Sequence, residues 1–241
     1  MRDNSAKLSN LKLRIISATL IGFTFITAIF FARPLFFAIM LVIAGLMLME
    51  WYNMTANTSH NANGSKMSKL DLANRQPSAV YLYSGLVIIT VPIISILHVS
   101  DIDKNGWVLF TFFAIIWSVD SFAMFFGKTL KGPKLAPVLS PNKTVSGLIG
   151  GVLAASFVPL ILAMLPFYDI TRYVDVTKLT LFWHTAIIGI IAQASDLFIS
   201  YFKRKFKIKD SGDIIPGHGG VLDRFDSIIF TAPVLAIYLN N

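Results

Sequence analysis

Seven apolar segments, separated by polar stretches, constrain this chain more than any other feature of its sequence. An apolar helix needs roughly 20 residues to cross the hydrocarbon of a bilayer, so segments near this length predict membrane-spanning helices. We expect spans at residues 15–32, 35–51, 79–98, 107–126, 145–167, 179–202 and 227–239, of which the second and the last are short. The pattern predicts an all-α polytopic membrane protein with about seven transmembrane helices.

The composition agrees with this fold class. Of the 241 residues, 55% are hydrophobic and only 14% are charged, which is typical of a membrane protein. We expect one membrane-embedded domain over residues 1–241. The absence of cysteine excludes disulfides, thiolate metal sites and cysteine nucleophiles.

The basic residues indicate how the spans are oriented. With the N-terminus on the cytoplasmic side, all but four of the 21 Lys and Arg residues fall in inner segments. The four outer ones are Arg33, Lys104, Arg172 and Lys178. The net charge of +8 is therefore attributed to basic loops that face the cytoplasm and anionic lipid, and nucleic acid is not expected as a partner.

Four aspartates fall at one depth in this arrangement, near the inner ends of three spans. They are Asp120, Asp196, Asp223 and Asp226. One ionisable residue in a span costs about 2.5–3.5 kcal/mol, so several at one depth indicate a functional site, although a single one would as readily be a structural ion pair. Carboxylates without cysteine or paired histidine suit a hard cation with oxygen ligands, and we expect Mg²⁺.

Two neighbouring stretches add groups that could bind phosphate. On a helix, Asp196, Ser200 and Lys203 share one face, with Arg204 beside them. Further on, Gly219 and Gly220 free the backbone to approach an anion. His218 could donate to phosphate or act as a general acid, and a structural turn histidine is an equal alternative.

The stretch 200–226 resembles the signature of the phosphatidate cytidylyltransferases, also called CDP-diacylglycerol synthases. That signature has Ser, Lys-Arg, Lys-Asp, Pro-Gly-His-Gly-Gly, Asp-Arg and a final Asp, in this order and at matching spacing. Its counterparts here are Ser200, Lys203, Arg204, Lys209, Asp210, Pro216, Gly217, His218, Gly219, Gly220, Asp223, Arg224 and Asp226. Residues 120–128 and 135–147 also look like family segments.

The resemblance implies transfer of a cytidylyl group from CTP to phosphatidic acid at the cytoplasmic edge of a bacterial inner (plasma) membrane. It implies Mg²⁺ or another divalent cation on Asp196 and Asp223, with room for a second cation. Catalytic roles are expected for Asp196, Asp223, Lys203 and Arg204, and further or alternative metal ligands are Asp226 and Asp120. Substrate-binding roles are expected for Lys143, Ser200, Lys209, Asp210, His218, Gly219, Gly220 and Arg224.

Some alternatives stay open at this point. Ser146 stands where the family generally has Glu, so the acceptor could be another lipid phosphate. An anion transporter would also place charges within spans, but it would spread them over several depths. The span 145–167 carries small residues at Ser146, Gly147, Gly150, Gly151, Ala154 and Ala155, which predict close helix packing, with a homodimer contact as the alternative.

Overall fold

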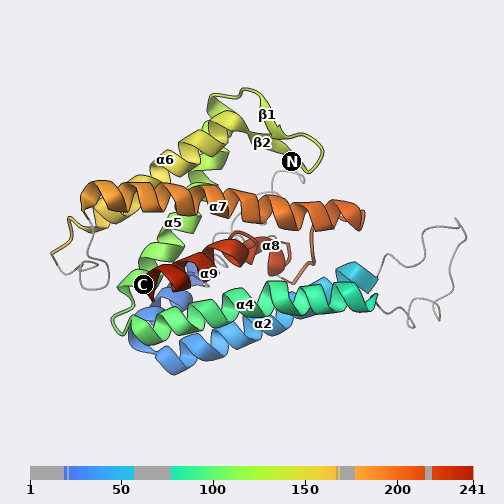
Figure 1. The fold of residues 1–241 in the computed structure, drawn as a ribbon, viewed down its shortest axis with the longest axis horizontal. Helices are drawn as coiled ribbons and strands as arrows, with labels where there is room; N and C mark the ends of the chain where they lie inside the picture. The colour runs from blue at the N-terminus through green and yellow to red at the C-terminus, as the bar shows by residue number, and fades with distance from the viewer. Residues whose placement is uncertain are drawn as a thin grey trace, which may run out of the picture.

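The structure, a computed structural model, describes residues 19–20, 22–56, 77–166, 168, 177–214 and 219–240 (Figure 1). His218, most of the polar loop expected between the second and third spans, and the first part of the first predicted span lie outside the described residues. A helix at Gly22–Phe31 comes first. The elements that follow are α2 (Arg33–Ala56), α4 (Ala79–Ile102), α5 (Trp107–Thr129), β1 (Lys134–Ala136), β2 (Ser140–Thr144), α6 (Val145–Leu162), α7 (Lys178–Lys205), α8 (Leu222–Phe225) and α9 (Ile228–Leu239).

The prediction of an all-α polytopic membrane protein is confirmed. Five helices, α2, α4, α5, α6 and α7, are long and apolar enough to cross a membrane. The two remaining predicted segments are also apolar helices, but their described parts are shorter, at Gly22–Phe31 and Ile228–Leu239. Within the described residues, the structure therefore supports five spans by length, and the count of seven stays a prediction.

The helix ends differ from the sequence-based prediction by up to five residues, and the two largest differences are in α2 and α6. The second segment, expected at 35–51, forms the 24-residue helix α2, which begins earlier and ends later. The fifth, expected to reach residue 167, ends at Leu162. Pro166 follows closely, and a residue that precedes proline disfavours the helical conformation. The prediction placed the end of this helix too late because it was based on apolar composition alone.

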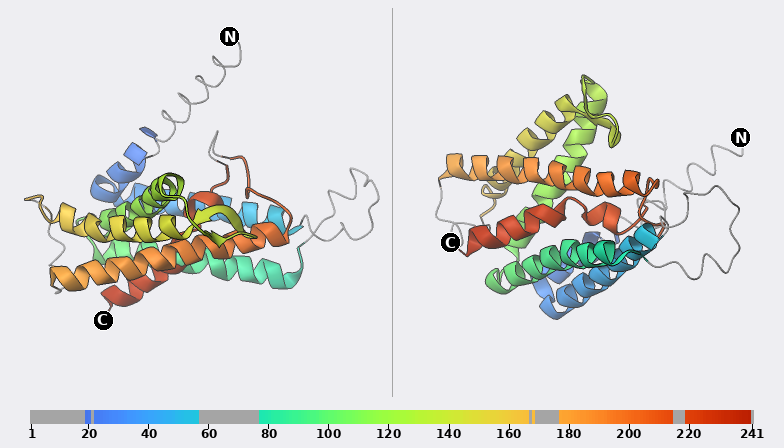
Figure 2. Two further views of the ribbon diagram at one scale, coloured as in Figure 1. Left: turned by 90° about the horizontal axis from the view of Figure 1, so that it is seen from above. Right: turned by 45° about the vertical axis from the view of Figure 1, so that its right-hand side comes forward.

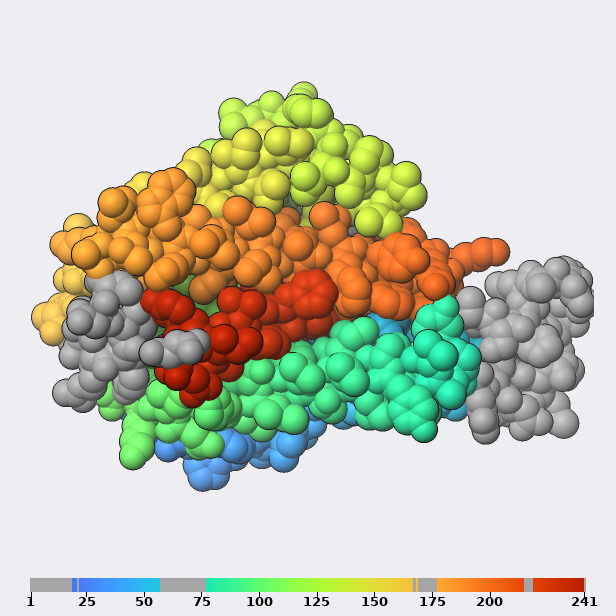
Figure 3. Space-filling view, in the orientation of Figure 1, coloured from blue at the N-terminus to red at the C-terminus, as the bar shows by residue number. Residues whose placement is uncertain are grey.

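The helices form two groups that meet along α7. On one side of α7, the short helix α9 lies between α7 and α4, and α2 packs against α4 (Figures 1 and 3). On the other side, α5 and α6 pack closely against each other, and α6 also packs against α7 (Figure 2). Because α7 touches both groups, side chains from either group can meet on its surface.

Polar contacts gather at the two ends of this bundle. At one end, the Arg33 guanidinium donates to the Ser100 carbonyl at 2.8 Å and to the Asp101 carboxylate at 2.7 Å. At the other end, the Trp51 indole donates to the Tyr81 carbonyl at 2.8 Å. We call this second end, where α7 finishes and α4 begins, the site end. The middle of the bundle is held by apolar packing, as the bilayer requires.

A small antiparallel hairpin, β1–β2, connects α5 to α6 at the site end. It pairs Lys134 with Thr144 and Ala136 with Ser140. Prolines at 133, 137 and 141 prevent a helix here, and a two-stranded edge tolerates them. The Thr144 hydroxyl then accepts a hydrogen bond from the Gly147 amide at 3.1 Å and caps α6. The hairpin was not predicted from the sequence.

The small residues of α6 serve packing within this chain. A Cβ atom at Gly147 would lie 2.6 Å from the Ala123 carbonyl oxygen, and one at Gly151 would lie 2.7 Å from the Val119 carbonyl oxygen. These glycines let the α5 and α6 backbones approach closely, as expected for helices in lipid. A homodimer contact through the rest of the α6 surface stays a prediction.

Gly151→Ala should weaken the α5–α6 contact, since the added methyl group meets backbone atoms that cannot turn away. We expect a loss of about 1–3 kcal/mol, typical of overpacking, measured as a lower thermal midpoint of the purified protein in detergent. The matched control is Gly45→Ala in α2, where an added Cβ meets nothing within 4 Å. Equal midpoints for the two variants would contradict this packing role.

Candidate active site

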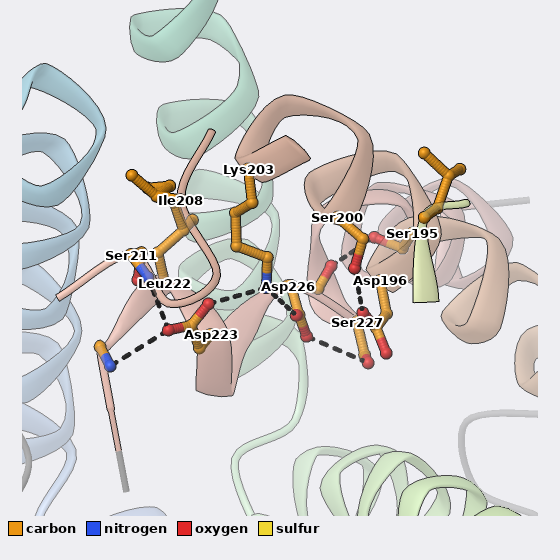
Figure 4. A network of polar contacts seen from close by, with 12 residues as sticks. Ser195, Asp196, Ser200, Lys203, Ile208, Ser211, Leu222, Asp223, Asp226 and Ser227 are labelled. Atoms are coloured by element: carbon orange, nitrogen blue, oxygen red, sulfur yellow. Dashed lines mark hydrogen bonds and ion pairs between the residues drawn. The ribbon is translucent and has the colours of Figure 1, made fainter. Parts of the chain in front are cut away.

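The first cluster of the site joins α7 to the β1–β2 hairpin and to α5. The Lys143 ammonium, on β2, lies 2.5 Å from one Asp196 carboxylate oxygen and donates to the Gln193 side-chain oxygen at 3.0 Å. The Ser200 hydroxyl donates to the other Asp196 oxygen at 3.2 Å (Figure 4). The Gln193 amide in turn reaches the Asp120 carboxylate at 3.4 Å. Three elements thus supply one polar cluster.

The second cluster joins α7 to the stretch around α8. The Lys203 ammonium lies 2.8 Å from the Asp223 carboxylate and 3.9 Å from that of Asp226 (Figure 4). The other Asp223 oxygen accepts hydrogen bonds from the backbone amides of Ser211 and Gly220, at 2.8 and 3.2 Å. Lys203 is almost fully buried. Asp223 therefore links Ser211 and Gly220 to each other and ties both to α7.

The two clusters lie close enough to interact electrostatically. Burial raises the pKa of Asp226 well above its ordinary value, and the neighbouring Asp196 carboxylate raises it further, against the opposing charge of Lys203. Asp120 repels the same group. Three of the four predicted aspartates are thus brought together with the lysines on one side of the bundle, where a further positive charge would relieve their repulsion.

Ser195 explains how the start of α9 is held against α7. This residue is fully buried. Its hydroxyl donates to the Asp226 carbonyl at 2.5 Å and accepts from the Phe230 amide at 3.3 Å. The hydroxyl therefore fixes the backbone next to the Asp226 side chain.

Arg204 and Ser146 are occupied with backbone groups in this structure. The Arg204 guanidinium donates to the Leu139 carbonyl at 3.1 Å and to the Ile208 carbonyl at 3.0 Å. The Ser146 hydroxyl donates to the Lys131 carbonyl. Both contacts brace the hairpin region, so the observed role of Arg204 is to hold the hairpin turn on α7. Its predicted catalytic role stays a prediction.

The remaining predicted substrate-binding residues lie around the same end. Lys209, Asp210 and Arg224 are exposed to solvent, and Arg224 is within electrostatic range of Asp120. Gly219 has a positive φ of 83°, a conformation that favours glycine, and a Cβ added to it would lie 3.4 Å from an Asp223 carboxylate oxygen. Gly220 is buried. His218 lies outside the described residues.

Glu50 was missed by the sequence reasoning. It lies on α2, is only 2% exposed, and accepts three hydrogen bonds from the stretch around α8. The donors are the Ser211 hydroxyl and the amides of Val221 and Leu222, each at 2.8 Å. A sequence signal was available, since Glu50 is an acid at the edge of an apolar span and such acids usually have a polar partner.

The carboxylates are of the right chemical type to bind a divalent cation, but their arrangement in this structure does not form a metal site. Oxygen donors without thiolates are what Mg²⁺ prefers. Within the described residues, however, no three Asp, Glu, His or Cys side chains form a group that could hold one metal ion. Lysine ammonium groups stand beside Asp196 and Asp223 instead. A cation on these carboxylates would therefore have to displace the lysine contacts.

Comparison with known proteins gives matches along most of the chain. Residues 69–241 match the model of a family described as the cytidylyltransferase family. A protein of Rickettsia felis named phosphatidate cytidylyltransferase is 50% identical over 226 residues, which cover 94% of this chain and 91% of the relative. One of Rickettsia typhi with the same name is 47% identical over 95% of this chain and 93% of the relative. In Staphylococcus aureus, a protein of that name is 49% identical over 53% of this chain and 46% of the relative.

Lys203→Met should destabilise the protein, because it leaves two nearly buried carboxylates without their cation. Removing one partner of a buried ion pair costs about 3–5 kcal/mol, so we expect a clearly lower thermal midpoint in detergent. Lys207→Met is the matched control, since Lys207 is exposed just beyond the end of α7. The structural role of the Lys203 pairs would be refuted by a midpoint equal to that of the control.

Proposed function

The chain belongs to the cytidylyltransferase family, and we propose that it transfers a cytidylyl group from CTP to phosphatidic acid. The products are CDP-diacylglycerol and pyrophosphate. The observation that carries this proposal is the 50% identity to a phosphatidate cytidylyltransferase over more than nine-tenths of both chains. No comparison favours a transporter or a different lipid phosphate as acceptor.

The reaction is an in-line displacement at phosphorus. A phosphate oxygen of phosphatidic acid bonds to the α-phosphorus of CTP, the bond from that phosphorus to the bridging oxygen breaks, and pyrophosphate leaves with the electron pair. Phosphatidate is already anionic near neutral pH, so no dedicated base is needed. What the protein must supply is positioning and positive charge, because both substrates are polyanions.

The lysines and arginines of the site end supply that charge in our proposal. Lys143 and Lys203 lie at the centre, each next to an aspartate. Lys209 and Arg224 are exposed at the rim, where a nucleotide arrives from water. Arg204 would act indirectly, since its guanidinium holds the hairpin turn and thereby the strand that carries Lys143.

A divalent cation completes the proposed site. Asp196 and Asp223 are the proposed ligands, with Asp226 and Asp120 as further carboxylates, and Mg²⁺ fits this all-oxygen donor set. A bound cation would neutralise negative charge on the triphosphate. The repulsion among Asp120, Asp196 and Asp226 supports this assignment, because a bound cation would relieve it.

The protein is an integral membrane protein of a bacterial membrane, and we place its site end in the cytoplasm. The basic side chains of the site end, which include Lys128, Lys131, Lys134 and Lys143, support that orientation through the preference of Lys and Arg for cytoplasmic loops. The N-terminus would then be cytoplasmic. We propose that residues 1–241 act as one domain, since α2 and α7, from its two halves, hold a common site.

Asp196→Asn should reduce transfer of labelled CTP into the lipid fraction by about a hundredfold or more, the scale of losing one charge-stabilising group. The assay contains purified protein, phosphatidic acid and Mg²⁺, with EDTA as a metal control. Asp101→Asn is the matched control, because Asp101 pairs with Arg33 at the opposite end. If wild-type protein transfers no label, the proposed function is refuted, and full activity of Asp196→Asn would refute the assigned site.

The orientation can be tested because the chain has no native cysteine. Single cysteines at Lys131, next to the hairpin, and at Lys104, in the turn between α4 and α5, lie at opposite ends of α5. In intact cells, a membrane-impermeant maleimide should label Lys104→Cys and spare Lys131→Cys until the membrane is permeabilised. The reverse pattern would invert the proposed orientation.

A further inference from the structure

Glu50 connects the signature stretch to a part of the chain that the family match does not include. The match begins at residue 69, whereas Glu50 lies near the end of α2. Its three hydrogen-bond donors are Ser211, Val221 and Leu222, and the last two directly precede Asp223 in the chain. We propose that Glu50 is a positioning residue for cytidylyl transfer, which holds this stretch so that Asp223 faces Lys203. This inference rests on the proposed function.

Both side-chain oxygens of Glu50 accept hydrogen bonds from this stretch. One of its oxygens accepts from the Val221 amide, and the other accepts from the Leu222 amide and the Ser211 hydroxyl. A carboxylate can accept all three hydrogen bonds. A glutamine amide could not, because its NH₂ group would face a backbone N–H whichever way it turned. The two oxygens of Glu50 are therefore matched to the donors that face them.

The backbone around Glu50 is shaped to let the loop approach. A Cβ atom at Gly212 would lie 2.7 Å from one Glu50 oxygen, and a Cβ at Gly220 would lie 2.6 Å from the other. Two glycines therefore stand where the loop passes Glu50 most closely. The Gly220 amide also donates to Asp223, so the same residue contacts both carboxylates. Displacing the loop from Glu50 would move the partners of Asp223.

The end of α2 that carries Glu50 is tightly packed against its neighbours. The next residue, Trp51, is 1% exposed, donates its indole N–H to the Tyr81 carbonyl at 2.8 Å, and packs its ring 5.0 Å from that of Phe202 on α7. A Cβ at Gly85 would lie 2.2 Å from the Trp51 ring, so α4 also fits tightly against it. Glu50 is thus fixed relative to α4 and α7, as a positioning residue must be.

Glu50→Gln is the first variant, and Ser211→Ala is a milder one that removes a single donor. Both are compared with wild type and with Gly45→Ala, a control on the same helix without nearby contacts. We measure kcat per folded enzyme and KM for CTP well below each thermal midpoint. In parallel, hydrogen exchange in substrate-free protein reports the amides of Ser211, Gly220, Val221 and Leu222.

Glu50→Gln should lower kcat per folded enzyme roughly ten- to hundredfold, the scale of a small misplacement of reacting groups, and should speed exchange of these amides. Ser211→Ala should have a smaller effect in the same direction, and Gly45→Ala none. A purely structural role would lower the thermal midpoint and leave kcat per folded enzyme unchanged, and that result would overturn the inference. The inference would also be overturned if the loop amides of Glu50→Gln exchanged at the wild-type rate. If wild type transfers no label, the proposed function fails and the exchange measurement decides whether Glu50 holds the loop.

Discussion

The ion pair between Lys203 and Asp223 is the interaction on which the site end depends. Lys203 lies on α7, the helix that both helical groups contact, and Asp223 lies in the stretch that leads into α9. A charge this deeply buried is tolerated only when it is paired and hydrogen-bonded. Asp223 fulfils that condition by binding two backbone amides as well, so the same contact that satisfies the charges also shapes the loop.

Much of this arrangement could be predicted from the sequence. The apolar segments predicted the helices because length and hydrophobicity in a bilayer leave few alternatives. The spacing of Asp196, Ser200 and Lys203 predicted one face of a helix, and Ser200 does bond to Asp196 on α7. The spacing of residues within one helix was sufficient to predict that these side chains lie on the same face.

Contacts between distant segments could not be predicted in the same way. Glu50 is 161 residues from Ser211 in sequence, and nothing in its neighbourhood indicates that partner. Arg204 belongs to a signature of charged residues, yet its guanidinium binds the carbonyls of Leu139 and Ile208, which depends on a hairpin that the apolar pattern did not reveal. Sequence motifs indicate which residues matter, whereas three-dimensional packing decides which groups they bind.

The shortness of α9 has a consequence for where the polar site can lie within the bundle. Its 12 residues extend about 18 Å, whereas the hydrocarbon core of a bilayer measures about 30 Å. Its last turn is level with the end of α4, where Asn240 meets His98. Its beginning, next to Asp226, therefore falls short of the start of α4 and the end of α7. The polar stretch around α8 occupies the rest of the layer between these two helices, so buried charges stand where a longer apolar helix would otherwise continue (Figure 1).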